Sequence, residues 1–494
     1  MIRLIHKGEP WTHPGCDMAS RKTLNAKNLE ALGVERLAEL LIEISRGNAA
    51  AQRRLRLELA GAASPADMAQ EIRKRLTAIA RSRSFIDWPQ RKALVADLET
   101  QRQAIAQVAK VDTAEALDLL WRFMALANSI FARCDDSSGS VIAVFQAACR
   151  DLGDIATAAD AAPNVLAEQA YRALIENEYG QYDGLIGVLA PALGAAGLDH
   201  LKHLILKLSQ EPRQKPRAED RKVIGWGMGG PLYADDLAER HRSSTVQMAL
   251  EAIADAQGDV DAFIAQQSEK ARGVPSVAVE IARRLLAAGR ADEAWAAINA
   301  VDQDRPGWIP VEWEQTRLEV LEALGRADEA QAFRWTCFEH SLNPEHLRSY
   351  LKRLPDFEDL EAEERAIAHA RNHPSVHHAL GFLVSWPALE HAAHLVLARA
   401  DEINGDFYEI LAPAAAALEA KHPLAATVLR RALIDFALER NRTKRYQHAA
   451  RHLEECENLA DRIEDFGRFE AHETYVRRLK AEHGRKSSFW GFVS

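Results

Sequence analysis

Apolar residues recur along this chain at spacings of three and four positions, which is the periodicity of an amphipathic helix. The pattern is clear in LGVERLAELLIEISRG, ALDLLWRFMALANSIFARC and HPLAATVLRRALIDFALER. Alanine and leucine dominate these segments, and the alternating β-branched runs that would indicate strands are nearly absent. The pattern therefore predicts an all-α protein.

Glycine, serine and proline mark the predicted helix ends. Gly33 and Gly47 follow helical segments, and Ser64 with Pro65 is typical of a cap followed by a new first turn. Further breaks are predicted at Pro163, Pro306, Pro310, Pro355 and Pro374.

An internal repeat refines this picture. The sequence GRADEA occurs at 289–294 and again at 325–330, a period of 36 residues. In each copy the glycine ends one helix, Ala-Asp-Glu begins the next, and the small Ala294 or Ala330 lets the two helices approach closely. One such hairpin cannot bury its own apolar face, so neighbouring hairpins are expected to stack into an α-solenoid.

The second copy, LGRADEAQAFRWTCFEHSLNPEH, resembles the second half of a tetratricopeptide repeat. Gly325, Ala330 and Pro344 lie near the small and proline positions of that pattern, whereas its Trp-x-x-Leu-Gly opening is missing. The segment 422–456 is predicted to form another degenerate hairpin. The resemblance implies a tetratricopeptide-like solenoid.

A second resemblance covers most of residues 18–494. The segments 79–99 and 134–153 and the ending LKAEHGRKSSFW are similar to the helical regions of bacterial SWIM zinc-finger proteins. They also resemble an uncharacterised bacterial family that keeps those helices alone. The SWIM finger needs a C-x-C pair followed by C-x-H, and this chain has neither. The finger's zinc and nucleic-acid roles are therefore not carried over.

One long stretch breaks the helical pattern. From 209 to 236 the chain is rich in glycine and proline, and VIGWGMGGPLYADD (223–236) is expected to form a crossing loop or a short hairpin, with glycine supplying positive φ at the turn. The predicted organisation is an extension or disordered tail (1–17), an N-terminal helical region (18–208), this insertion (209–236) and C-terminal tetratricopeptide-like repeats (237–494).

The glycines of this insertion match a dinucleotide-binding fingerprint. Gly225, Gly227 and Gly230 have the spacing G-x-G-x-x-G, which works where a strand delivers the first glycine and the third opens a helix. No βαβ unit surrounds them, and Asp235 and Asp236 would place negative charge where a phosphate should lie. We therefore predict no nucleotide and no other cofactor.

Trp226 lies between Gly225 and Gly227, and Tyr233 follows the last glycine; two roles are open for these aromatic residues. They either fasten the insertion to the helices or form an aromatic anchor for a protein partner.

Composition supports a globular protein of a reducing compartment. The chain of 494 residues is 47% hydrophobic and 27% charged, and it contains no apolar run long enough to span a membrane. Five scattered cysteines without C-x-x-C spacing argue against disulfides and a cysteine zinc finger, and their apolar helical contexts favour packing. A cytoplasmic location without a membrane partner is expected.

Charge is distributed unevenly. Residues 1–110 contain 19 basic and 12 acidic side chains, whereas residues 111–200 contain 4 basic and 13 acidic ones. A basic stretch within 53–92 is a candidate phosphate-binding surface, with Phe85 and Trp88 nearby for stacking. Its basic residues include Arg73, Lys74, Arg75, Arg81 and Arg83. The alternative is a helix face that complements the acidic segment of the same molecule.

Histidines at four-residue spacing raise the question of a metal. His369, His373 and His377 form one set, but Pro374 interrupts their helix; His448, His452 and Cys456 form another, without the glutamate of a H-E-x-x-H motif. Neither set has an evident further ligand, and no metal ligand is predicted.

The segment CDDSSG (134–139) is interpreted as a helix-to-helix turn capped by Ser137 or Ser138, with an acidic metal pair at Asp135 and Asp136 as the alternative.

Together these observations favour a non-enzymatic scaffold that holds a protein partner on a concave or grooved surface. Nucleic-acid binding through residues 53–92 is the alternative, and a hydrolase with an unrecognised carboxylate or histidine site is a weaker one. No catalytic residue is predicted.

Overall fold

The computed structural model describes residues 23–211, 216–217, 220–227, 229–301 and 310–493. They form two compact units, and the division falls between Gln267 and Ser268. The segment 209–236 and the helix after it thus belong to the first unit, and the four-region organisation predicted above stays a prediction. The predicted tail 1–17 and Pro306 lie outside the described residues.

The first unit contains helices of very different lengths and a single described pair of strands. Its elements are α1 (Ala26–Glu30), α2 (Val34–Ser45), α3 (Ala49–Ala63), α4 (Pro65–Arg81), α5 (Trp88–Val108), α6 (Thr113–Met124), α7 (Ala127–Phe131), α8 (Ser140–Ala158), α9 (Pro163–Ile175), α10 (Leu185–Gln210), β1 (Val223–Gly227), β2 (Gly230–Tyr233), α11 (Ala234–Gln257) and α12 (Val260–Gln266).

All regular elements described in the second unit are helices. Its elements are α13 (Glu269–Arg272), α14 (Pro275–Ala287), α15 (Ala291–Asn299), α16 (Val311–Ala323), α17 (Ala327–Ser341), α18 (Pro344–Leu351), α19 (Glu358–Arg371), α20 (Val376–Ser385), α21 (Leu389–Ala398), η2 (Ala400–Glu402), α22 (Tyr408–Leu418), α23 (Pro423–Glu439), η3 (Thr443–Arg445), α24 (Tyr446–Ala460), α25 (His472–His483) and α26 (Ser487–Trp490).

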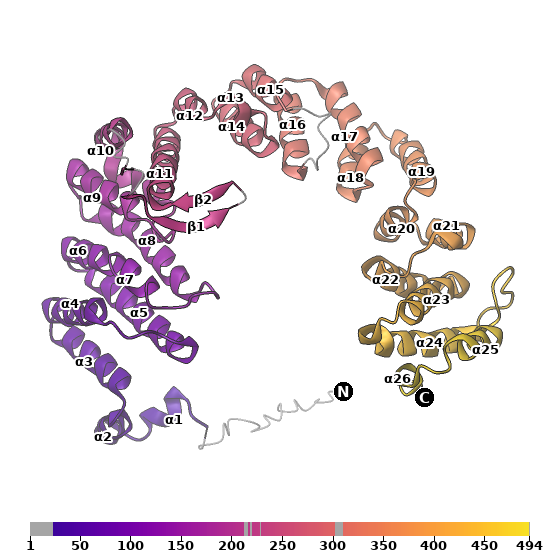
Figure 1. Ribbon diagram of the computed structural model, residues 1–494, viewed down its shortest axis with the longest axis horizontal. Coiled ribbons are helices and arrows are strands. Elements are labelled where there is room, and N and C mark those ends of the chain that lie inside the picture. The colour runs from indigo at the N-terminus through magenta and orange to yellow at the C-terminus, as the bar shows by residue number, and fades with distance from the viewer. Residues whose placement is uncertain (1–22, 212–215, 218–219, 228, 302–309, 494) are drawn as a thin grey trace, which may run out of the picture. The chain divides into compact units, whose positions relative to one another are not determined.

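Helices pack mainly on their neighbours in the sequence, as in a stack of hairpins (Figure 1). In the first unit α9 packs on α10 and α10 on α11; in the second unit α14 packs on α15, and α22 and α24 both pack on α23. The predicted all-α, solenoid-like fold is confirmed. None of the helices in the described residues combines the length and apolar character needed to cross a membrane.

Helix ends follow the predicted signals. The Ser64 side chain accepts a hydrogen bond from the Asp67 amide, and Pro65 occupies the first position of α4. Gly33 and Gly47 adopt left-handed φ angles of +82° and +77°, which a side chain would disfavour. Pro163 begins α9.

The internal repeat corresponds to two helical hairpins, α14–α15 and α16–α17. Gly289 and Gly325 end the first helix of each at φ +74° and +69°, and Ala294 and Ala330 are buried in the helices that follow. The predicted helical hairpin is confirmed in both copies. The segment 422–456 is likewise helical, because α23 and α24 occupy it.

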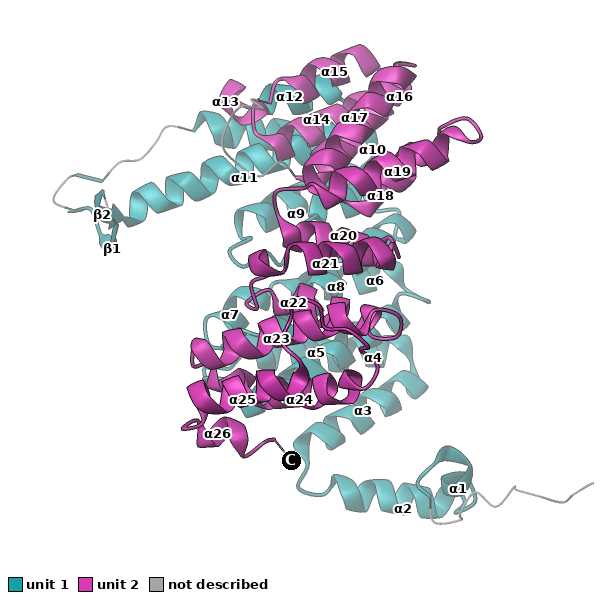
Figure 2. Ribbon diagram, turned by 90° about the vertical axis from the view of Figure 1, so that its right-hand side faces the viewer, with its two compact units in different colours: residues 1–267 teal, residues 268–494 magenta. Residues whose placement is uncertain are grey.

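The helix α11 differs from the others in how little of it is buried. Its buried residues are Ala249, Leu250, Ile253 and Ala254, all near its C-terminal end. At 1.5 Å per residue, the helix extends about 22 Å before the first of them. Figure 2 shows this N-terminal part reaching beyond the other helices of the first unit, with β1 and β2 at its tip.

Candidate functional site

The glycine-rich segment forms the predicted hairpin. Strands β1 and β2 pair antiparallel, with Trp226 opposite Pro231 and Gly227 opposite Gly230, and a bulge lies between Val223 and Gly225. Gly230 adopts φ +114°, a conformation that glycine adopts without strain. The glycines thus allow a tight connection between two short strands.

An ionic and aromatic cluster fastens the base of the hairpin to α11. The Arg221 guanidinium forms ion pairs with Asp235 at 2.8 Å and Asp236 at 2.7 Å, both in the first turn of α11. The same guanidinium lies over the Tyr233 ring, 3.8 Å from its centroid. Tyr233 therefore contributes to this attachment, and the aspartates balance both Arg221 and the positive end of the helix dipole.

Trp226 lies on the opposite part of the hairpin, away from this base. Its side chain is 78% exposed. Other apolar side chains of the hairpin and the start of α11 are also exposed: Val223, Ile224, Leu232 and Leu237. The structure therefore separates the two aromatic residues, because Tyr233 packs at the base while Trp226 faces solvent.

The geometry differs from that of a dinucleotide-binding loop. Gly225 and Gly227 lie within β1, and Gly230 begins β2, whereas the fingerprint requires the third glycine to open a helix. The next helix begins at Ala234, and Arg221 already pairs with the acidic side chains of its first turn.

Three basic residues of α4 lie beside acidic partners. Arg73 pairs with Glu115 at 2.5 Å and approaches Asp118 at 3.5 Å, both in the acidic segment. Arg75 pairs with Asp97, and Lys74 pairs with Glu71 at 2.7 Å. These contacts agree with the intramolecular alternative for Arg73.

Arg81 and Arg83 are in a different setting. Both are exposed at the end of α4, and the nearby Phe85 and Trp88 side chains are 66% and 76% exposed. The connection between α4 and α5 is held in place by the amide of Ile86, which donates to the Arg133 carbonyl at 2.8 Å. A fixed loop thus presents two arginines and two aromatic rings to solvent.

The CDDSSG segment is a turn between helices, as interpreted, but the predicted capping residue is wrong. The Asp136 carboxylate accepts hydrogen bonds from the amides of Val141 and Ile142 at 2.8 to 3.0 Å, in the first turn of α8. Gly139 occupies the N-cap position, so neither Ser137 nor Ser138 does. The carboxylate of Asp136, three residues before the N-cap Gly139, instead accepts the amide hydrogens at this helix end.

Three histidines of the two sets form hydrogen bonds with other protein groups. The His369 ring bonds to the Glu339 carbonyl at 3.0 Å, and His377 Nε2 accepts from the Asn404 amide at 3.0 Å. His452 Nδ1 bonds to Glu455, three residues further along α24. These contacts account for the orientation of the three rings.

A different cluster brings together metal-ligating side chains. Glu314, Cys337 and His346 offer donor atoms that all lie within 4.8 Å of one another, and they come from α16, α17 and α18. Sequence spacing gave no signal for it, because the three residues belong to three helices and share no motif.

The described cysteines are buried. Burial raises the pKa of Cys149, Cys337 and Cys456 to about 12, which keeps these thiols protonated and unreactive at neutral pH. For Cys149 and Cys456 this supports the interpretation that they serve packing. Cys16 lies outside the described residues.

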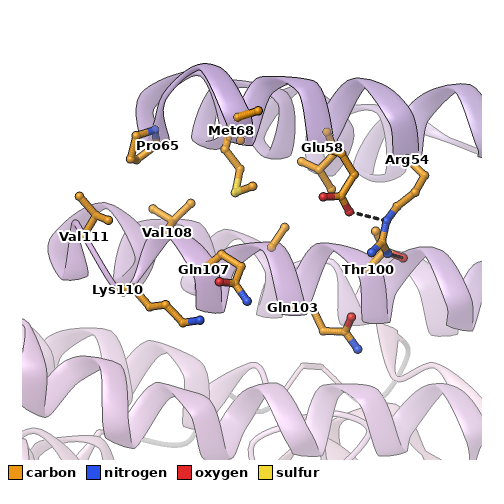
Figure 3. Close-up of a pocket in the computed structure, with 14 residues that line it drawn as sticks. Arg54, Glu58, Pro65, Met68, Thr100, Gln103, Gln107, Val108, Lys110 and Val111 are labelled. Atoms are coloured by element: carbon orange, nitrogen blue, oxygen red, sulfur yellow. Dashed lines mark hydrogen bonds and ion pairs between the residues drawn. The ribbon is translucent and has the colours of Figure 1, made fainter. Parts of the chain in front are cut away.

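A groove of about 630 Å³ lies between α3 and α5 in the first unit (Figure 3). At one end Arg54 pairs with Glu58 at 2.8 Å and donates to Thr100 Oγ1 at 3.2 Å. Gln103, Gln107 and Lys110 line its α5 side. Leu57, Met68, Val108 and Val111 also line the groove, so its surface combines polar and apolar side chains.

Comparison with known proteins identifies the family. The model of DUF6880, a family of unknown function, matches residues 19–492, and the chain belongs to that family. The predicted membership of an uncharacterised family is confirmed, whereas the SWIM resemblance and bacterial origin stay predictions. The curated proteins searched contain no match. A solved circular tandem repeat protein with novel repeat topology and enhanced subunit contact surfaces is 14% identical over 95% of each chain, with a TM-score of 0.16.

Proposed function

We propose that this protein is a non-enzymatic helical scaffold that binds a protein partner through the β1–β2 hairpin. The observation that carries the proposal is the exposure of Trp226 on a hairpin whose base is fixed by Arg221. Tryptophan supplies a large apolar surface with few rotatable bonds, and it is enriched among the residues that dominate binding energy. A fixed base reduces the ordering cost of binding.

The hairpin also offers backbone groups to a partner. Both outer edges of its two-stranded sheet are unpaired in the described part of the chain. Pro231 has no amide hydrogen, which makes β2 the poorer edge for adding a strand. We therefore expect an extended partner segment to pair with β1 and to pack against Trp226.

The proposal is tested by affinity capture from an extract of the source cells with the full chain and Trp226→Ala. We expect one protein to be recovered in near-stoichiometric amount with the unaltered chain. Loss of the Trp226 ring should weaken its binding about 30-fold, which corresponds to about 2 kcal/mol for a central tryptophan.

Trp88→Ala is the matched control, because Trp88 is 76% exposed in the same unit. It should capture the same protein as the unaltered chain. Recovery of nothing above background, or equal recovery with Trp226→Ala, would contradict the proposal.

The α4–α5 corner supports a second candidate function, nucleic-acid binding. Arg81 and Arg83 are exposed beside the exposed rings of Phe85 and Trp88, a combination that suits backbone phosphates and stacked bases. A short single-stranded oligonucleotide should bind with an affinity that falls steeply with salt and with Trp88→Ala, and Trp226→Ala should leave it unchanged. Binding that is absent or insensitive to salt excludes this function.

A further inference from the structure

The Glu314, Cys337 and His346 side chains meet inside the second unit. The His346 Nε2 atom lies 3.0 Å from Glu314 Oε2, and the Cys337 Sγ atom completes a set whose members are within 4.8 Å of one another. Their helices α16, α17 and α18 are consecutive, and α17 packs on both of the others. Three donors of different chemistry thus converge from three helices.

The cluster lies in the interior. Cys337 is 4% and His346 is 6% exposed, and the Glu314 side chain is 16% exposed. Burial of a carboxylate and an imidazole costs free energy unless strong partners satisfy them. A bound cation would satisfy all three groups at once.

The internal repeat shows that the fold itself does not require polar groups there. With the period of 36 residues, Glu314 corresponds to Ala278 and Cys337 to Val301. Both are buried apolar residues, at 0% and 5% exposure. The first copy therefore packs the equivalent positions with hydrocarbon, and the second copy replaces them with groups that can bind a metal.

We propose that Glu314, Cys337 and His346 bind a zinc ion. Sulfur, imidazole nitrogen and carboxylate oxygen together match zinc, whereas magnesium and calcium prefer oxygen alone. Zinc bonds of about 2.0 to 2.3 Å place tetrahedral ligand atoms about 3 to 4 Å apart, close to the spacing found here. On binding, the Cys337 thiol releases its proton to solvent and the thiolate becomes the ligand.

The fourth zinc position is left for water. Among the described residues the cluster contains no fourth histidine, cysteine, aspartate or glutamate. The ion joins the second repeat hairpin, α16–α17, to the next helix, α18, and so stabilises this part of the second unit. The site is remote in sequence from the β1–β2 hairpin, and metal binding there does not depend on the proposed function.

The test uses the full-length chain, stripped with a chelator and then titrated with zinc. We expect one tightly bound zinc per chain by elemental analysis, and a thiolate-to-metal charge-transfer band when cobalt replaces zinc. The variants Cys337→Ser and His346→Gln should each reduce bound metal to less than about a tenth, because each removes one of only three protein ligands. Metal binding should raise the unfolding temperature of the unaltered chain but not that of Cys337→Ser or His346→Gln.

Cys456→Ser is the matched control, because Cys456 is also a buried free cysteine of the second unit. It should retain one zinc per chain. If Cys337→Ser or His346→Gln fails to fold, the test uses Glu314→Gln instead, because Glu314 is the more exposed ligand. Circular dichroism checks the helical content of each variant. An unaltered chain that takes up no zinc, or Cys337→Ser that keeps it, overturns the proposal and leaves a hydrogen-bonded cluster without metal.

Discussion

The helices α23 and α11 are both long, yet they have opposite surroundings. In α23 eleven of 17 residues are buried, whereas in α11 four of 24 are. The apolar pattern of α23 continues around much of its surface, and α11 begins with the polar run ADDLAERHRSST. The difference shows that α23 lies within the core of its unit, whereas most of α11 lies at the surface of its own unit.

Even the charged residues of α23 are used for packing. Arg430 is 3% exposed, and it bridges Glu419 at 2.5 Å and Glu455 at 2.8 Å, which lie on neighbouring segments. On α11 the comparable ion pair joins Arg242 to Glu239 within one helix. Arg430 of α23 therefore forms ion pairs with two other segments, whereas Arg242 of α11 pairs within its helix and donates to the Glu211 carbonyl at the end of α10 at 3.3 Å.

The largest expected difference between the two helices concerns their leucines. Leu429→Ala in α23 removes a side chain with 0% exposure and should lower the free energy of unfolding by about 2 to 5 kcal/mol through lost burial and a residual cavity. Leu237→Ala in α11, where the leucine is 54% exposed, should change it by less than about 0.5 kcal/mol. Urea unfolding of both variants measures the two values, and equal losses would contradict the comparison.

Replacing a glycine beside α23 should also destabilise the protein more than replacing a glycine in the hairpin that precedes α11. A Cβ atom at Gly405 would lie 2.0 Å from the Ala432 carbonyl oxygen of α23, so Gly405→Ala should cost about 1 to 3 kcal/mol through overpacking. At Gly229, in the hairpin turn, the same atom would meet nothing within 4 Å. Gly229→Ala should therefore leave the thermal midpoint nearly unchanged, and a large fall there would show that the hairpin is tightly packed.

The sequence was sufficient to predict the features that depend on local signals. The helical period, the cap at Ser64, the repeated glycines and the hairpin all reflect residues that are close along the chain. The opposite surroundings of α11 and α23 are also visible in their composition. These features need no knowledge of which helix lies beside which.

Features that depend on tertiary contacts could not be predicted. Glu314, Cys337 and His346 converge only because three helices pack with particular rotations about their axes. Likewise, the Asp136 side chain reaches forward to accept a hydrogen bond from the Ile142 amide in the first turn of α8. Ser137 and Ser138 are of the residue type expected to cap a helix, but neither is at the N-cap position. Periodic histidines were a poor guide, because equal spacing marks a helix face without showing what packs on it.

The comparison extends to pH through His452 of α24, which packs beside α23. Burial lowers the pKa of His452, although Glu455 opposes the shift; Arg430 and His448 also lower it. The unfolded chain takes up this proton near pH 6.5, before the folded chain does. Stability from this group is thus present above about pH 6.5 and is lost as the pH falls toward the lower pKa of the folded state.

We therefore expect the free energy of unfolding to fall on acidification below about pH 6.5, and His452→Gln to flatten part of that dependence. Burial also lowers the pKa of His377 and His472, so some dependence should persist in the variant. His241→Gln on the exposed part of α11 is the control. Urea unfolding midpoints measured across this pH range test this expectation. The same pH dependence of the midpoint in the unaltered chain and in His452→Gln would exclude a contribution from His452.

The smallest expected effect on stability belongs to Trp226. Because its side chain is 78% exposed, Trp226→Ala should change the free energy of unfolding by no more than about 0.5 kcal/mol. Folding alone then gives no reason for the largest apolar side chain at that position, whereas the same substitution is expected to weaken partner binding about 30-fold. Thermal unfolding and affinity capture with one preparation separate the two effects. A substantial loss of stability would instead show that Trp226 contributes to packing, as the buried side chains of α23 do.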